Sequence, residues 1–258
     1  MLFVEKRDGV ARVILDRPEV RNAFDDVLIS KLKNAFEEIA NDNAIRVVIL
    51  AGNGPAFCAG ADLNWMKRMA GYTYEQNRAD AQALADMLAA LDRMPKPTIA
   101  RVHGPAFAGG TGLVAACDIA VGTPEAKFCF SEAKLGLSPA TISPHVMRAI
   151  GEPAARRYFL TAEVFDAQEA FRIGLLSILT GDLDQTIEEL LKHLLAGGPE
   201  AMRQIKDLIR TVSGRPVDDA LAAETAKRIA EIRVSPEGKE GIASFLEKRK
   251  PSWSSRKS

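Results

Sequence analysis

The amino-acid sequence predicts an α/β protein with an all-helical C-terminal module. A short apolar run, a glycine-rich turn and a helix follow one another twice, first at Ile45 to Leu50 and again at Thr98 to Val102. After Leu183, apolar residues recur only at helical spacing, and no strand pattern interrupts them. We therefore expect a core of residues 1–195 and a helical module of residues 196–258, joined near Gly197-Gly198-Pro199.

The first 50 residues predict a β-hairpin, a helix and a buried strand. Leu2 to Lys6 and Val10 to Leu15 alternate around Asp8-Gly9, a dipeptide that suits positive φ in a tight turn. An apolar stripe at helical spacing predicts the helix, and its residues are Leu28, Leu32, Phe36 and Ile39. Asp25 or Asp26 can cap its N-terminus. Ile45 to Leu50 is short and β-branched, which is typical of a buried strand.

The middle of the chain repeats this order. Thr73 and Gln76 match a capping box, and the helix that they open must stop before Pro95. Thr98 to Val102 predicts a second buried strand, and the glycine turn after it opens a small-residue helix from about Gly109 to Cys117. Three further core strands are predicted, at Ile119 to Val121, Lys127 to Phe130 and Leu176 to Leu179. Three further helices are predicted: one that is ended by Gly151, one from Glu152 to Thr161 and one from Asp166 to Arg172.

Composition and charge weigh against several function classes. The chain carries 34 basic and 34 acidic side chains, so its net charge gives no reason to expect nucleic acid or an anionic membrane as partner. No run approaches the roughly 18 apolar residues of a membrane helix, and charges stand where a signal peptide needs its apolar stretch. The 3 cysteines and 3 histidines show no metal-ligand spacing. We expect a cytoplasmic protein with reduced cysteines and no metal site.

Four motifs occur in the order typical of one known family. They are Leu15-Asp-Arg-Pro-Glu-Val-Arg-Asn-Ala-Phe24, Phe57-Cys-Ala-Gly-Ala-Asp-Leu63, Gly104-Pro-Ala-Phe-Ala-Gly-Gly110 and Phe128-Cys-Phe-Ser-Glu-Ala-Lys-Leu-Gly-Leu137. At these residues the sequence resembles the crotonase (enoyl-CoA hydratase/isomerase) superfamily, whose members bind acyl-CoA thioesters and stabilise a thioester enolate. The resemblance implies a crotonase-like spiral of ββα units and C-terminal helices that join subunits into trimers or dimers of trimers. It also implies an acyl-CoA thioester substrate, of which coenzyme A is a part, and no separate cofactor.

The resemblance also assigns roles to individual residues. The backbone N–H groups of Ala61 and Gly109 would form the oxyanion hole, because two such turns side by side offer two donors to one oxygen anion. Glu132 would be the catalytic carboxylate facing the acyl α- and β-carbons, since an apolar pocket raises a carboxyl pKa toward the working pH. The residues carried over as substrate- and CoA-binding are Val20, Arg21, Ala23, Ala59, Asp62, Leu63 and Asn64.

One departure from the family pattern leaves the reaction open. Well-known family hydratases carry a second glutamate three residues after the second oxyanion glycine, where this chain has Gly112. The Δ3,Δ2-enoyl-CoA isomerases use a single glutamate in the position of Glu132. The surrounding sequence, however, looks most like bacterial hydratases of branched, carboxylated substrates such as methylglutaconyl-CoA and carboxygeranoyl-CoA, which also lack the second glutamate. We expect an enoyl-CoA hydratase, with an isomerase or a non-catalytic acyl-CoA-binding protein as alternatives. His145, which follows the loop lining the family's acyl pocket, is a candidate water holder.

Overall fold

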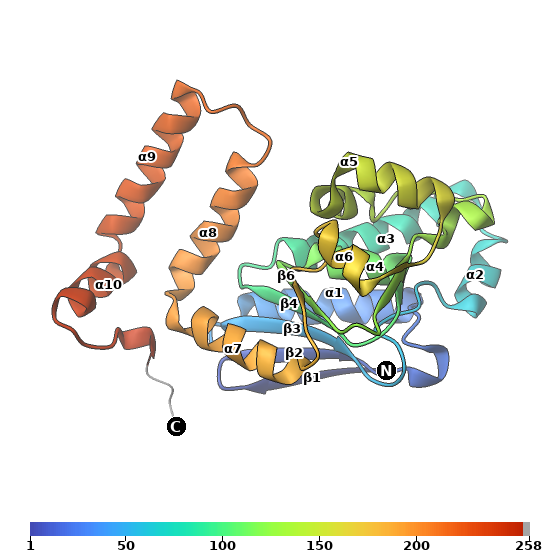
Figure 1. The fold of residues 1–258 in the computed structure, drawn as a ribbon, viewed down its shortest axis with the longest axis horizontal. Coiled ribbons are helices and arrows are strands. Elements are labelled where there is room, and N and C mark those ends of the chain that lie inside the picture. The colour runs from blue at the N-terminus through green and yellow to red at the C-terminus, as the bar shows by residue number, and fades with distance from the viewer. Residues whose placement is uncertain (255–258) are drawn as a thin grey trace.

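The computed structural model describes residues 1–254 and has a six-stranded sheet at its centre (Figure 1). The strands of this sheet lie in the order β1-β2-β3-β4-β6-β9, and only the first pair is antiparallel. Their bounds are β1 Leu2–Arg7, β2 Val10–Leu15, β3 Val47–Gly52, β4 Thr98–Val102, β6 Ile119–Gly122 and β9 Ile178–Leu179. A smaller sheet has the order β5-β7-β8, with bounds Ala106–Phe107, Lys127–Cys129 and Phe165–Asp166.

The predicted hairpin at the start of the chain is confirmed. Asp8 and Gly9 both have positive φ, at 50° and 80°, which is the backbone conformation of a two-residue turn matched to the twist of its strands. Residues Leu2 to Arg7 pair with Leu15 to Val10 in unbroken register. β2 then pairs in parallel with β3, so the hairpin becomes one edge of the main sheet.

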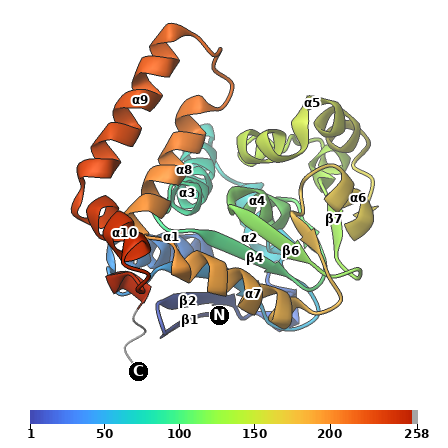
Figure 2. The ribbon, with the colours of Figure 1, turned by 60° about the vertical axis from the view of Figure 1, so that its left-hand side comes forward.

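Helices cover both faces of the main sheet (Figure 2). On one face lie α1 Asp26–Asn41, α3 Tyr74–Asp92 and α4 Gly109–Ala116. α1 begins as predicted, because the Asp25 carboxylate accepts a hydrogen bond from the Leu28 N–H at 2.9 Å. The predicted stripe is fully buried and consists of Leu28, Leu32, Phe36 and Ile39. Each such side chain contributes about 1.5–3 kcal/mol through burial.

The opposite face of the sheet is covered by α7, Leu183–Ala196. Leu183, Ile187 and Leu191 of this helix pack against alternate strand residues in a second apolar cluster, whose strand members are Val10, Val47, Ile49, Ile99 and Val121. The intervening residues of β3, Val48 and Leu50, belong to the cluster on the other face. A strand buried on both faces explains why β3 is a continuous apolar run without alternation.

The smaller sheet carries α5, Ser143–Thr161, and α6, Ala167–Arg172. Gly151 interrupts α5 with a φ of 72°, which confirms the predicted break between two helical segments. α6 begins after Asp166, whose carboxylate accepts from the Glu169 N–H at 2.8 Å. Aromatic rings fill the space between α5 and this sheet, with the Tyr158 and Phe165 ring centroids 4.2 Å apart.

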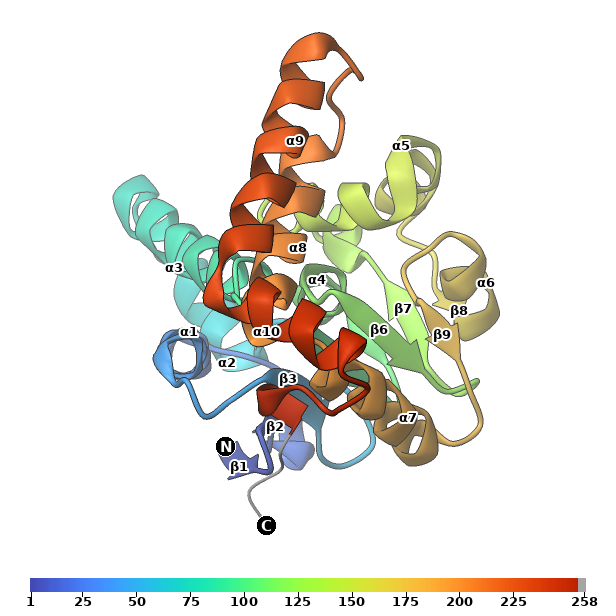
Figure 3. The same ribbon diagram turned by 90° about the vertical axis from the view of Figure 1, so that its left-hand side faces the viewer.

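The C-terminal part of the described chain is helical, as predicted, and extends away from the sheet (Figure 3). It comprises α8 Pro199–Val212, α9 Asp219–Val234 and α10 Pro236–Leu246. α8 is tied to the core by the buried Lys206, whose Nζ contacts the Asp118 carboxylate at 2.5 Å and the Lys96 carbonyl at 3.1 Å. The division at residues 195 and 196 remains a sequence-based proposal, and positions 255–258 of its second part lie outside the described residues.

Several predicted boundaries are wrong by a few residues. β3 begins at Val47, because the Ile45 N–H closes a turn onto the Asp42 carbonyl at 3.0 Å. β7 stops at Cys129, and only Ile178 and Leu179 of the predicted last strand pair with β6. The seven-residue helix α2, Leu63–Met69, was not predicted, since two turns are too short to show a helical period. No helix within residues 1–254 combines the length and the apolar character needed to cross a bilayer.

Candidate active site

A cavity of about 570 Å³ opens beside the first turn of α4. Its walls come from α2, from α3, and from the segment that follows β7. Ala61, Gly109 and Glu132, which the sequence predicts to share one site, all line it. The complete lining is Phe24, Ala59, Ala61, Leu63, Trp65, Met66, Met69, Asn77, Asp80, Ala81, Leu84, Ala108, Gly109, Ser131, Glu132, Leu135, Leu137, Ser138, Pro139, Ala140, Thr141 and Ile142.

The Ala61 N–H is held in the cavity wall by a one-residue bridge to Phe24. The Phe24 N–H donates to the Gly60 carbonyl at 2.8 Å, and the Asp62 N–H donates to the Phe24 carbonyl at 3.0 Å. The bridge uses the carbonyl of Gly60 and the N–H of Asp62. The N–H of Ala61 itself has no backbone acceptor within residues 1–254. Gly60 has a φ of +90°, a conformation that L side chains rarely adopt, so the turn depends on glycine.

The second donor lies at the first residue of α4. The Ala108 N–H donates to the Cys129 carbonyl at 2.7 Å, whereas the Gly109 N–H has no backbone acceptor in the described part of the chain. A Cβ at position 109 would lie 2.3 Å from Cζ of Phe24, so only glycine fits there. The N-terminus of a helix favours negative charge. Ala61 and Gly109 thus line one cavity, and neither N–H has a backbone acceptor within residues 1–254.

Glu132 lies in a short 3₁₀-helix, Ser131–Leu135, on the wall of the same cavity. Its Oε2 atom is buried and makes no hydrogen bond within residues 1–254. Burial raises the pKa of this carboxyl above its ordinary value, and a hydrogen bond from its own backbone N–H partly opposes the shift. A carboxyl with a raised pKa is suited to accepting a proton and returning it.

The position of the missing second glutamate is filled by a neighbouring side chain. A Cβ at Gly112 would lie 2.4 Å from Cγ2 and 2.9 Å from Cβ of Ile142. Ile142 is 2% exposed and lines the cavity, so it is well packed where a longer side chain from position 112 would have to pass. Where α4 meets the cavity, the Ile142 side chain therefore packs against Gly112, and α4 contributes no carboxylate.

His145 does not join this site. Its Nδ1 lies 3.9 Å from the Asp92 carboxylate, and the residue does not line the cavity. Burial lowers the pKa of its imidazole, while Asp92 partly opposes that shift. Its position does not support the hypothesis that it holds the attacking water.

The predicted substrate-binding residues separate into two groups. Ala59 and Leu63 line the cavity. The other group, Val20, Arg21 and Ala23, belongs to a segment that lies beside Ala59. The Ala59 N–H donates a hydrogen bond to the Arg21 carbonyl at 3.0 Å. The Arg21 side chain is exposed, as a phosphate contact requires.

Asp62 and Asn64 do not line the cavity. Asp62 is buried and caps α2, accepting from the Asn64 N–H at 2.8 Å and the Trp65 N–H at 3.3 Å. Its other oxygen pairs with the Arg17 guanidinium at 3.1 Å. Both oxygens of the Asp62 carboxylate therefore hold the turn that follows Ala61. Asn64 points to solvent as an exposed residue of α2.

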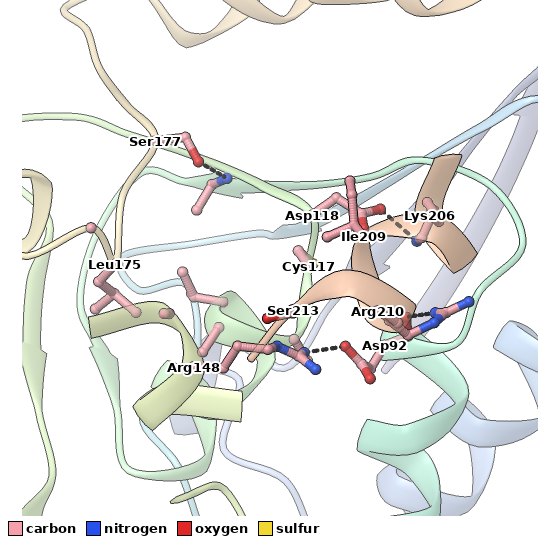
Figure 4. A pocket seen from close by; sticks show the side chains of 16 residues that line it. Asp92, Cys117, Asp118, Arg148, Leu175, Ser177, Lys206, Ile209, Arg210 and Ser213 are labelled. Atoms are coloured by element: carbon pink, nitrogen blue, oxygen red, sulfur yellow. Dashed lines mark hydrogen bonds and ion pairs between the residues drawn. The ribbon is translucent and has the colours of Figure 1, made fainter. Parts of the chain in front are cut away.

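A second groove of about 640 Å³ lies between α8 and the segment around α4 and α5 (Figure 4). It is lined by five charged residues, Asp92, Asp118, Arg148, Lys206 and Arg210. Each cation has a partner: Arg148 pairs with the Asp92 carboxylate, Lys206 pairs with Asp118, and Arg210 donates to the Asp92 carbonyl at 3.2 Å. None of the predicted site residues lines this groove.

Comparison with known proteins identifies the family. A family model described as enoyl-CoA hydratase/isomerase matches residues 5–256. The chain belongs to this family. The solved structure of an enoyl-CoA hydratase from Shewanella pealeana shares 45% identity and a TM-score of 0.96, covering 98% of this chain and 95% of that one. The Pseudomonas aeruginosa protein AtuE shares 35% identity and a TM-score of 0.93, covering 98% and 99% of the two chains. The enoyl-CoA hydratase AKT6-1 of Alternaria alternata is 36% identical over 253 residues, which span 96% of this chain and 82% of the relative.

These comparisons confirm the crotonase-like α/β fold and an enzyme of the enoyl-CoA hydratase class. Phe24 and Asp80 also line the cavity, and the sequence did not single them out as site residues. Phe24 closes a predicted motif and bridges to Ala61, so it carried a positional signal. Asp80 carried none, because an isolated aspartate on an amphipathic helix cannot be told from a solvated surface group.

Proposed function

We propose that the protein hydrates the 2,3 double bond of an enoyl-CoA thioester and that Glu132 is the only carboxylate carrying protons in this reaction. The observation that supports the proposal best is the convergence of the Ala61 N–H, the Gly109 N–H and the Glu132 carboxyl on one cavity. The thioester oxygen would accept from the two N–H groups, with the enoyl carbons next to Glu132. The exposed Arg21 would contact a phosphate of the coenzyme A portion.

The reaction balances with a single proton carrier. Ionised Glu132 takes a proton from water while the water oxygen bonds to C3, and the electrons of the double bond move onto the thioester oxygen as an enolate. The two N–H groups stabilise that enolate, each typically by about 3–4 kcal/mol. Protonated Glu132 then gives its proton to C2, which forms the 3-hydroxyacyl-CoA and restores the ionised carboxylate. Burial favours the protonated intermediate form of Glu132, because it raises the pKa.

A Δ3,Δ2-enoyl-CoA isomerase is the second candidate. The packing of Ile142 against Gly112 favours it, since no second carboxylate reaches the cavity from α4 to orient water. In that reaction Glu132 removes a proton from C2 of a 3-enoyl-CoA and returns it to C4, and the same two donors stabilise the dienolate. Both candidates use the same residues, and only hydration adds an oxygen atom to the substrate.

The proposal is tested by a panel of enoyl-CoA thioesters followed at the enoyl-thioester absorbance. Glu132→Gln keeps the size of the side chain but cannot ionise, so turnover should fall by about 10² to 10⁴-fold. Glu125→Gln is the matched control, because Glu125 is exposed and does not line the cavity. If the Glu132 variant keeps wild-type turnover, Glu132 is not the proton carrier and both mechanisms fail. If the wild-type protein transforms none of the thioesters but binds them, both proposed reactions fail.

We also propose that the helices after α7 join subunits into a trimer or a dimer of trimers. This segment stands away from the sheet and exposes large apolar side chains, namely Ile205, Ile209, Val217, Ile229, Val234, Ile242, Phe245 and Leu246. An exposed apolar surface of this kind is typical of an interface between proteins. Sedimentation at micromolar concentration should show a trimer or hexamer, and a stable monomer would contradict the assignment.

A further inference from the structure

Two aspartates that cap helices divide their carboxylate oxygens in the same way. Oδ1 of Asp25 accepts from the Leu28 N–H at 2.9 Å at the start of α1, and Oδ2 of Asp25 lies 3.0 Å from the Arg17 guanidinium. Oδ1 of Asp62 accepts from the Asn64 N–H at 2.8 Å at the start of α2, and Oδ2 of Asp62 lies 3.1 Å from the same guanidinium. Arg17 therefore joins the first turns of two different helices.

These two aspartates directly follow the two residues of the bridge that carries one oxyanion donor. Phe24, which precedes Asp25, pairs with Ala61, which precedes Asp62, through hydrogen bonds of 2.8 and 3.0 Å. The bridge is isolated and lies outside the named strands, so no strand ladder fixes the direction of the Ala61 N–H. Arg17 links the two segments one residue beyond the bridge in each of them.

Arg17 is itself held in place. Its backbone N–H donates to Oδ1 of Asn22 at 2.8 Å, and the Asn22 N–H donates to the Arg17 carbonyl at 2.9 Å. Asn22 is fully buried, and its Nδ2 donates to the carbonyls of Asn53 and Ala56 at 2.8 and 2.9 Å. Nη1 of Arg17 also donates to the Ala23 carbonyl at 2.8 Å. The Arg17 side chain is 16% exposed, so solvent screens its ion pairs less than those of a surface arginine.

The shape of the guanidinium matters for this link. Its donors form a planar fork, so Nη1 and Nη2 each face a different carboxylate at a fixed separation. A lysine ammonium is a single point charge on a flexible stem, and it cannot hold the same acceptors in the same directions. Without any cation, the Asp25 and Asp62 carboxylates would face each other as like charges.

We propose that Arg17 is a positioning residue for the oxyanion hole: by holding the Asp25 and Asp62 carboxylates together, it fixes the direction of the Ala61 N–H. Arg17 does not line the cavity, so it acts through Ala61 and not on the substrate. The inference rests on the proposed function, in which the Ala61 N–H donates to the thioester oxygen. It extends that function by assigning part of the rate to a residue outside the cavity.

The kinetic test uses Arg17→Lys, which keeps the positive charge but loses the fork. Arg68→Lys is the matched control, because Arg68 of α2 pairs with Asp26 of α1 and so links the same two helices at exposed residues that do not cap them. A misplacement of about 1 Å can cost about 10²-fold in rate, so kcat and kcat/KM of Arg17→Lys on a 2-enoyl-CoA should both fall by about 10- to 10²-fold. Arg68→Lys should leave both unchanged.

A spectroscopic measurement separates positioning from a general loss of structure. Infrared difference spectra of butyryl-CoA, labelled with carbon-13 at the thioester carbonyl, report how strongly the oxyanion hole polarises that carbonyl. Binding to the wild type should move the carbonyl band to lower frequency, and Arg17→Lys should reduce this shift while Arg68→Lys keeps it. Asp25→Asn should also reduce the shift, because its amide oxygen can still cap α1 while the charge that faces Arg17 is lost.

The outcomes separate this inference from the reaction itself. A wild-type band shift together with wild-type kcat in a folded Arg17→Lys protein would overturn the inference and leave hydration intact. If circular dichroism shows that Arg17→Lys does not fold, Asp25→Asn decides by the same two readouts. No band shift on binding to the wild type would also overturn the inference, since the Ala61 N–H would then not donate to the carbonyl. If the band shift depends on Arg17 but the wild type hydrates no 2-enoyl-CoA, the positioning role stands and the proposed reaction fails.

Discussion

Gly109→Ala should damage both the fold and the oxyanion hole. The added methyl group would lie 2.3 Å from Cζ and 2.9 Å from Cε2 of Phe24. Carbon atoms prefer a separation of about 3.5–4.0 Å, so one of the two groups must move by about 1 Å. The Phe24 ring is 1% exposed and rests against Trp65, which leaves it little room to retreat. We expect the variant to lose about 1–3 kcal/mol of unfolding free energy through overpacking.

If the backbone at position 109 yields instead, its N–H leaves the place where the enolate oxygen forms. A misplacement of about 1 Å can cost about 10²-fold in rate. Urea unfolding and kcat/KM measure the two effects separately. Phe24→Leu removes the atom that clashes, so the double variant Gly109→Ala/Phe24→Leu should be more stable than the sum of the single changes by about 0.5–3 kcal/mol. Gly181→Ala is the control, since a Cβ there meets nothing within 4 Å, and its effect should stay within about 0.5 kcal/mol.

Wild-type stability together with wild-type kcat/KM in Gly109→Ala would refute this reasoning. So would strict additivity in the double variant, because it would show that the two side chains do not compete for one space.

Three further predictions concern the carboxylates and the helix contacts. Gly112→Glu should lose about 1–3 kcal/mol of unfolding free energy in urea, and Ile142→Ala in the same chain should recover part of it; a well-folded single variant would contradict the packing argument. Lys206→Met leaves the one-third-exposed Asp118 carboxylate without its cation, so the unfolding free energy should fall by about 1–3 kcal/mol, and amide exchange in α8 should speed up; unchanged exchange would show that this pair does not hold α8. Burial raises the pKa of Glu132, so the folded wild type holds the carboxyl proton more tightly than the unfolded chain does. The free energy of unfolding of the wild type therefore falls as the pH rises above 4.5. Glu132→Gln should therefore gain stability relative to wild type between pH 4.5 and the raised pKa, and a pH-independent difference would contradict the burial of this carboxyl.

The sequence was sufficient where a local rule decides the structure. Asp8-Gly9 specifies a turn with positive φ at both residues, and Gly151, two residues before Pro153, supplies the positive φ at which the helical run breaks. The stripe from Leu28 to Ile39 predicts one buried face without any knowledge of its partner. The glycine turns were also predictable, since small residues directly after apolar runs mark close backbone approach.

The sequence was insufficient where distant segments meet. Two strands, β6 and β7, and a short 3₁₀-helix separate Gly112 from Ile142 in the sequence, and nothing local indicates that one fills the space of the other. The sequence also does not show that the two oxygens of Asp62 cap α2 and pair with Arg17.

In the proposed hydration, Glu132 moves a proton from water to C2 and the water oxygen bonds to C3. Incubation of the protein with a 2-enoyl-CoA in oxygen-labelled water, followed by mass spectrometry of the thioester, tests it directly. We expect a 3-hydroxyacyl-CoA carrying one labelled oxygen, formed about 10² to 10⁴-fold more slowly by Glu132→Gln. Conversion of a 3-enoyl-CoA to the 2-enoyl-CoA with no label taken up, and no hydroxyacyl product from the 2-enoyl-CoA, would contradict hydration and assign the carboxylate to isomerisation.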